Sequence, residues 1–98
     1  MISRHWTCVT HPESAADYER YLRTQMFKAM EKIDGFRSAV ILRRDTPEGL
    51  VYRVVTEWAS MDAIRAFAGE DVETAVVPEK VRPWMIRFDD RVVHYEVR

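Results

Sequence analysis

The order in which strand-like and helix-like apolar patterns follow one another constrains the fold of this chain most strongly. Ile2–Val9 alternates between apolar and polar residues, which predicts a first strand. Over Ser14–Gly35 the apolar residues recur at helical spacing instead, which predicts one long amphipathic helix. We expect Ser14, with Asp17 three residues later, to mark its start and Gly35 its end. The stripe expected to be buried consists of Tyr18, Leu22, Met26, Ala29, Met30 and Ile33.

A hairpin and a second helix follow in the pattern. Phe36–Arg44 and Leu50–Trp58 are two β-rich runs joined by DTPEG, whose proline and glycine favour a turn, so we expect a hairpin. Ser60 is expected to cap a helix that carries Ile64 and Phe67 on its buried side.

The last part of the chain completes the order. Asp71 is expected to cap a last helical turn that Pro78 closes, and Ile86–Val97 reads as the fourth strand. The order β-α-β-β-α-β predicts an α+β, ferredoxin-like fold with an antiparallel four-stranded sheet. Because 98 residues support one modest core, residues 1–98 are expected to form a single domain.

Composition argues against several partners. The chain has 15 Lys and Arg against 16 Asp and Glu, with the signs mixed along it, so we expect no nucleic-acid partner. The longest clearly apolar run, Ala39–Leu42, is far too short to cross a membrane, and the N-terminus lacks the apolar core of a signal peptide. We therefore expect a cytoplasmic protein with no membrane partner.

Cysteine and histidine give little support for a metal site. Cys8 is the only cysteine, and it is expected to be a buried strand residue. The three histidines are scattered, without zinc-type spacing, so no metal and no cofactor are expected. A weaker alternative pairs His5 with His94 across the first and fourth strands, next to a carboxylate. His11 is expected to lie on the surface.

Both faces of the predicted sheet are apolar. On the third strand Tyr52 and Val54 point to one side while Val51 and Val55 point to the other. Two helices can cover only one face of such a sheet, and an antiparallel sheet with a solvated back normally shows polar residues there. We therefore expect a homodimer packed sheet to sheet.

Three segments, EWASMDAIRAF, FAGEDVETAVVP and VVHYEV, resemble the antibiotic biosynthesis monooxygenase (ABM) family of dimeric α+β barrels. That family includes cofactor-independent oxygenases of quinols and anthrones, and haem-degrading monooxygenases. The resemblance implies a pocket between sheet and helices, and cofactor-independent oxygenation of a small aromatic or quinol-like molecule. The alternative is a non-catalytic, ligand-binding or structural homodimer of the same fold.

The haem-degrading branch of the family uses an Asn on the first strand, a Trp on the second helix and a His on the following turn. The resemblance puts Phe67 where that Trp belongs and Val77 where that His belongs, and the chain contains no Asn. Valine has no lone pair for iron, so haem degradation by this route is not expected unless His94 or His5 ligates the iron instead.

An oxygenase without metal or flavin needs a dry aromatic pocket and a group that sets the ionisation of the substrate. His94, within the predicted fourth strand, is a candidate general base. The alternative is a histidine bonded across the dimer to a carboxylate such as Glu96 or Glu57. The candidate catalytic residues are His94, Tyr52 and Trp58. The candidate pocket residues are Trp6, Met26, Met30, Phe67 and Trp84. The same side chains are also suited to filling a core.

Overall fold

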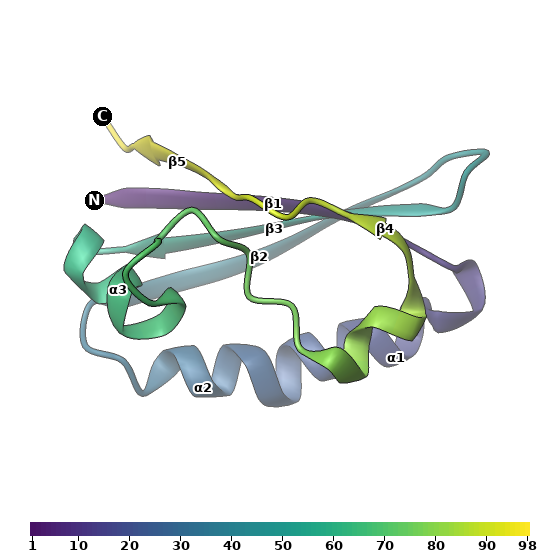
Figure 1. Cartoon of the computed structure of the whole chain (residues 1–98), viewed down its shortest axis with the longest axis horizontal. Helices are drawn as coiled ribbons and strands as arrows, with labels where there is room; N and C mark the ends of the chain where they lie inside the picture. The colour runs from purple at the N-terminus through teal and green to yellow at the C-terminus, as the bar shows by residue number, and fades with distance from the viewer.

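The computed structural model describes all 98 residues and has helices packed on one face of an antiparallel sheet (Figure 1). The strands are β1 (Ile2–Thr10), β2 (Phe36–Asp45), β3 (Leu50–Trp58), β4 (Met85–Phe88) and β5 (Val93–Glu96). The helical segments are η1 (Pro12–Ser14), α1 (Ala15–Tyr21), η2 (Leu22–Met26), α2 (Phe27–Glu31), α3 (Met61–Ala68) and η3 (Glu79–Trp84). The sheet order is β2-β3-β1-β4, and β5 also pairs with β1. The predicted α+β, ferredoxin-like fold is confirmed.

The hairpin of β2 and β3 forms as predicted, with Asp45 opposite Leu50. Gly49 is required next to this turn because a Cβ atom there would lie 2.6 Å from the carbonyl oxygen of Thr10. Leu50 through Trp58 then alternate between the helix-covered face and the opposite face, and every second side chain is buried.

The first helical region runs from α1 through η2 to α2. It begins at Ala15, but Ser14 makes no capping hydrogen bond, and Asp17 pairs with Arg20 instead. The segment η2 is a π-helical turn, which is wider than an α-helical turn. The stripe that faces the sheet therefore repeats every fourth residue, with Tyr18, Leu22 and Met30 buried and Met26 half-buried. Ala29, predicted to be buried, is exposed.

Two predictions in the last third of the chain are wrong for one reason. Residues 69–78, which we call the strap, contain no helical turn closed by Pro78, and the fourth strand is split into β4 and β5. The backbone N–H of Val92 donates to Glu73, and that of Ala75 donates to Asp90. These hydrogen bonds hold residues 73–75 against residues 90–92, so neither segment is free to form a helix or a continuous strand with β1.

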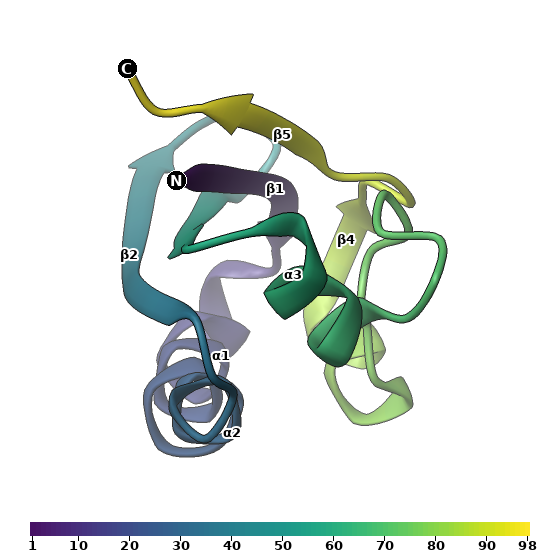
Figure 2. The same ribbon diagram turned by 90° about the vertical axis from the view of Figure 1, so that its left-hand side faces the viewer.

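The two faces of the sheet differ in their cover. The helices, the strap and η3 all lie on one side of the sheet, and no helix covers the other side (Figures 1 and 2). Apolar side chains on that open side are exposed, including Val40, Leu42, Val93 and Tyr95, with 54% of Tyr95 accessible. The apolar back face predicted from the sequence is thus confirmed. No helix of the chain is long and apolar enough to cross a membrane.

Candidate functional site

A cavity lies between the covered face of the sheet and the helices. The space that the centre of a water molecule can occupy in it is about 50 Å³, and 12 of its 15 lining residues are hydrophobic. The sheet and its flanks contribute Arg4, Trp6, Val54, Thr56, Met85 and Val92. The helices contribute Tyr18, Tyr21, Leu22, Met26, Met30 and Phe67. The strap and η3 contribute Val76, Pro78 and Val81.

Strand register brings the floor of the cavity together. Arg4 is opposite Thr56 and Trp6 is opposite Val54 in the β1–β3 pair, and all four side chains face the helices because strand side chains alternate. The π-helical turn η2 contributes Leu22 and Met26 to the facing wall. Such turns occur frequently at functional sites.

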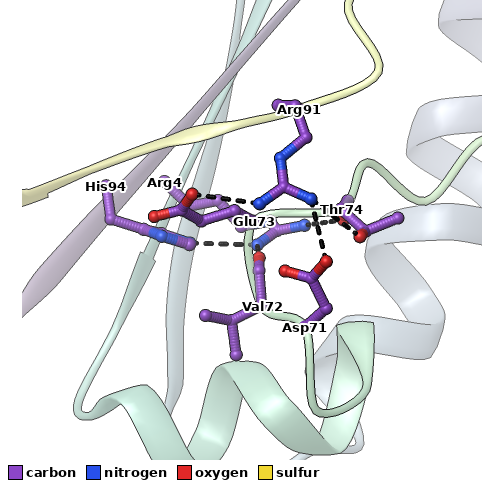
Figure 3. Close-up of polar contacts among 7 residues, drawn as sticks. All are labelled: Arg4, Asp71, Val72, Glu73, Thr74, Arg91 and His94. Atoms are coloured by element: carbon purple, nitrogen blue, oxygen red, sulfur yellow. Dashed lines mark hydrogen bonds and ion pairs between the residues drawn. The ribbon is translucent and has the colours of Figure 1, made fainter.

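Arg4 is the one charged residue in the cavity wall, and only 5% of its surface is accessible. Its Nη1 donates to the Val72 carbonyl oxygen at 2.5 Å, and its Nη2 donates to the Thr74 carbonyl oxygen at 3.1 Å (Figure 3). Nη1 also lies 2.9 Å from Nε2 of His94. Because arginine can only donate, this His94 nitrogen accepts, and the imidazole is neutral.

The charge of Arg4 has no carboxylate partner. Two of the strap carboxylates, Asp71 and Glu73, form ion pairs with Arg91 at 2.8 and 3.1 Å (Figure 3). Burial lowers the pKa of Arg4 to about 10, so the guanidinium stays charged at neutral pH. The Cζ atom of the Arg4 guanidinium lies 5.8 Å from the centre of the Phe67 ring, a contact of the cation–π type.

The phenols near the cavity are neutral. Burial raises the pKa of Tyr18 and of Tyr21, which both line the cavity. Cys8, beneath Tyr18, is completely buried, and burial raises the pKa of its thiol to about 12. The expectation that Cys8 is a buried strand residue is confirmed, and a thiol with this pKa is not a nucleophile at neutral pH.

Four of the candidate site residues, Trp6, Met26, Met30 and Phe67, line the cavity together. Trp84 does not line it and packs against the edges of Tyr18 and Tyr21.

Tyr52 and Trp58 are fully buried behind the cavity wall. The Tyr52 hydroxyl donates to Glu19. Burial, followed by this hydrogen bond, raises the pKa of Tyr52 to about 12. The Trp58 indole donates to Thr56 Oγ1 at 2.9 Å and stacks on Phe67. Both side chains therefore contact residues that shape the cavity rather than the cavity itself.

His94 is half-buried and touches the site only through Arg4. Burial and then the charge of Arg4 lower its pKa. His5 lies on the opposite face of β1, 2.9 Å from the Ser3 hydroxyl and edge-on to Tyr95. Because His5 and His94 lie on opposite faces, they do not form the paired site considered above. The structure contains no group of three His, Cys, Asp or Glu side chains placed to hold a metal ion.

Several residues that line the cavity were not predicted from the sequence. The strongest signal was Arg4, a charged residue at an inward position of β1, where the neighbours at the same alternation are Ile2, Trp6 and Cys8. Tyr21 gave no comparable signal, because it falls beside the predicted stripe.

The fold recurs among solved structures. The Streptomyces coelicolor monooxygenase ActVA-Orf6, in complex with nanaomycin D, is 18% identical, with a TM-score of 0.69 over 99% of this chain and 87% of that one. The haem degrader MhuD of Mycobacterium tuberculosis, with two haems bound, is 22% identical, with a TM-score of 0.69 over 99% and 95%.

A Caulobacter crescentus protein described as an antibiotic biosynthesis monooxygenase is 26% identical, with a TM-score of 0.64 over 96% of this chain and 84% of that one. No curated protein matched the sequence. The family profile named Antibiotic biosynthesis monooxygenase matches residues 1–77, and the chain therefore belongs to the antibiotic biosynthesis monooxygenase family.

Proposed function

We propose that this protein is a cofactor-independent monooxygenase that oxidises a small aromatic or quinol-like molecule. The observation that carries the proposal is a cavity with an apolar, aromatic wall and one buried cation, Arg4. Flat rings stack well on Trp6 and Phe67, and the flexible Met26 and Met30 adapt to the outline of a ligand. A wall of this kind also excludes water from a reactive intermediate.

The chemistry requires little from the protein beyond binding and ionisation. An anthrone, or a quinol in its keto tautomer, loses a proton from a CH₂ group, and the resulting anion transfers electrons to oxygen and forms a peroxide at that carbon. Loss of water from that peroxide converts a CH₂ group and O₂ into a carbonyl group and H₂O, so atoms and electrons balance. The enzyme must therefore hold the substrate as its anion and keep bulk water out.

The candidate catalytic residues take supporting roles in this proposal. His94 positions Arg4 through the 2.9 Å contact and does not reach the cavity. Trp58 fixes Thr56 and Phe67, which both line the cavity. Tyr52 anchors the helix that carries Tyr18 through its bond to Glu19.

Two other activities are disfavoured by particular residues. MhuD binds haem, but here Val77 offers no lone pair, and the Nε2 lone pair of His94 accepts from Arg4. A non-catalytic binder of the same fold uses the same cavity, and a buried cation in its wall is less expected there than in an enzyme that ionises its substrate. Oxygen consumption distinguishes the proposed oxygenase from a non-catalytic binder.

The proposal includes a homodimer and, as expected from the sequence, a cytoplasmic location. The open face of the sheet carries Val40, Leu42, Val93 and Tyr95 in exposed positions, and a second copy would bury them. On the same face the Nδ1 atom of His5 is buried and has no hydrogen-bond partner within the chain. An unpaired buried nitrogen is costly, and a partner subunit is one source of the missing partner.

Oxygen uptake by purified protein tests this proposal. The substrates are a panel of anthrones and quinols in buffer containing a chelator, and haem with a reductant is run alongside. We expect oxygen uptake above the protein-free rate with an anthrone or quinol. With haem and reductant we expect no uptake above the protein-free rate. Uptake with haem alone would replace the proposal by haem degradation, and no uptake on any substrate would favour the non-catalytic binder.

A further inference from the structure

We infer that Arg4 makes the cavity selective for aromatic ligands that carry an anionic oxygen, as in an ionised phenol or enol, and that the guanidinium binds this oxygen directly. This inference rests on the proposed function for the identity of the cavity as the substrate site. It goes further by naming the ionisation state of the ligand and the residue that selects it.

The hydrogen bonds of Arg4 leave room for such a ligand. Three of the five guanidinium N–H groups donate to Val72, Thr74 and His94. The Nε–H group and one Nη2–H group have no acceptor within the chain. On a guanidinium these two nitrogens share one edge, which is suited to binding an oxyanion.

The charge around Arg4 favours an anion as well. All three of its partners are neutral, since two are backbone carbonyl oxygens and His94 accepts through an unprotonated nitrogen. The nearest acidic side chains of the strap, Asp71 and Glu73, are engaged with Arg91. A buried cation without an anion is costly, so a ligand that supplies the anion gains binding energy.

The position of Arg4 connects this charge to the aromatic wall. Arg4 lines the cavity together with Trp6 and Thr56, and its guanidinium is beside the ring of Phe67. A ligand ring that packs against these apolar side chains therefore has a hydrogen-bonding cation at its edge. The phenols of Tyr18 and Tyr21 are neutral and do not compete for it.

The test measures the ionisation of a bound probe and requires no turnover. The probe is 2-naphthol, whose naphtholate form has a distinct absorption band, and titrations are run without oxygen. The matched neutral probe is 2-methoxynaphthalene, which cannot ionise. We expect the pKa of bound 2-naphthol to fall by about 1–3 pH units relative to water, because an opposite charge at hydrogen-bonding distance favours the anion. This fall corresponds to a preference for the anion of about 10-fold to 1000-fold.

Two variants assign the effect to the charge of Arg4. Arg4→Met should leave bound 2-naphthol neutral while 2-methoxynaphthalene still binds. Arg20→Gln, the control, removes an exposed arginine that pairs with Asp17 on α1 and leaves Arg4 and the strap in place, so it should keep the lowered pKa of the probe. If Arg4→Met fails to fold, neutral 2-naphthol in the wild-type cavity would still overturn the inference.

Three results would overturn the inference: neutral 2-naphthol in the wild-type cavity, an equally lowered probe pKa in folded Arg4→Met, or no binding of either probe. Failure of the proposed function is a separate result. Naphtholate binding without oxygen uptake on any quinol would leave an anion-binding protein that is not an oxygenase. Oxygen uptake with a probe that stays neutral would leave an oxygenase in which Arg4 is structural.

Discussion

Arg4 and His94 lie directly opposite each other in the β1–β5 pair, and the Arg4 guanidinium donates to the neutral His94 imidazole at 2.9 Å. The same guanidinium holds the strap through Val72 and Thr74 and lines the cavity. The buried guanidinium of Arg4 thus links β5, the strap and the candidate site.

Replacing His94 tests whether it positions Arg4. His94→Phe removes the acceptor, and a hydrogen bond to a charged group contributes about 1.5–3 kcal/mol. Since His94 is half-buried, we expect the free energy of unfolding to fall by an amount near the lower end of that range. We also expect the pKa of bound 2-naphthol to be lowered less than in the wild-type protein. His94→Gln is the matched control, because its amide oxygen is also an acceptor. Complete loss of oxygen uptake in a stable His94→Gln variant would instead indicate a general base.

The same contact predicts how stability depends on pH. The folded-state pKa of His94 is lowered, first by burial and then by Arg4, while Glu73 acts in the opposite direction. Burial and Arg53 likewise lower the pKa of His5. The unfolded chain therefore takes up protons first, so stability is full above about pH 6.5 and is lost as the pH falls through the folded-state values.

Thermal melting between about pH 5 and pH 7 checks this sign, in a range above the usual titration of carboxylates. We expect the melting temperature to fall on acidification, and to fall less in His94→Gln. A melting temperature that rises as the pH is lowered over this range would contradict the assignment of neutral histidines.

Filling the cavity should weaken binding without unfolding the protein. Met26→Trp adds volume at a half-buried lining position, and overpacking of this kind costs about 1–3 kcal/mol. We expect affinity for 2-methoxynaphthalene to fall by at least about 10-fold, as the lining contacts are lost. Ala29→Trp, exposed on the same helical region, is the control and should bind normally. Unchanged affinity in Met26→Trp would place the ligand elsewhere.

Tyr52 and Trp58 should affect stability more than chemistry. Tyr52→Phe removes the hydrogen bond to the Glu19 carboxylate, for which we expect a loss of about 1.5–3 kcal/mol in the free energy of unfolding, with oxygen uptake retained. Trp58→Ala should cost about 3–5 kcal/mol because the indole is fully buried. Urea denaturation measures both losses. A folded Tyr52→Phe variant without activity would instead give Tyr52 a direct catalytic role.

The open face of the sheet should form the dimer contact. Light scattering at micromolar concentration is expected to give twice the chain mass of 11.6 kDa for the wild-type protein. Adding a charge at an exposed apolar position, as in Tyr95→Asp, should shift the mass towards that of one chain, because the charge would be buried in the interface. Ala16→Asp, the control, places a charge at an exposed position of α1 and should leave the mass of the dimer unchanged. A monomeric wild-type protein would contradict the predicted dimer.

The local patterns of the sequence predicted the elements well where packing follows alternation. β3 is the best case, since every second side chain from Leu50 to Trp58 is buried, as the alternation of a strand predicts. Ser60 also caps its helix as predicted, accepting from the Ala63 N–H at 3.3 Å. Both features depend on neighbours that are close in the sequence.

The parts that could not be predicted depend on distant partners. The strap and the break between β4 and β5 are set by hydrogen bonds such as Val92 to Glu73, which no local pattern reports. The π-helical turn η2 likewise lacks a glycine or proline to mark it. The role of Arg4 became visible only when the fold placed its guanidinium beside Val72, Thr74 and His94, which are far from it in the chain.

Isotope labelling shows whether the protein inserts an oxygen atom of O₂ into its substrate. An anthrone is oxidised by the purified protein under ¹⁸O₂ in the presence of a chelator, and the quinone product is analysed by mass spectrometry against a protein-free control. For a monooxygenase we expect a product formed faster than in the control, with one ¹⁸O atom in the new carbonyl group and one O₂ consumed for each product molecule. Product formation at the protein-free rate, or a new carbonyl oxygen derived from water, would contradict this expectation.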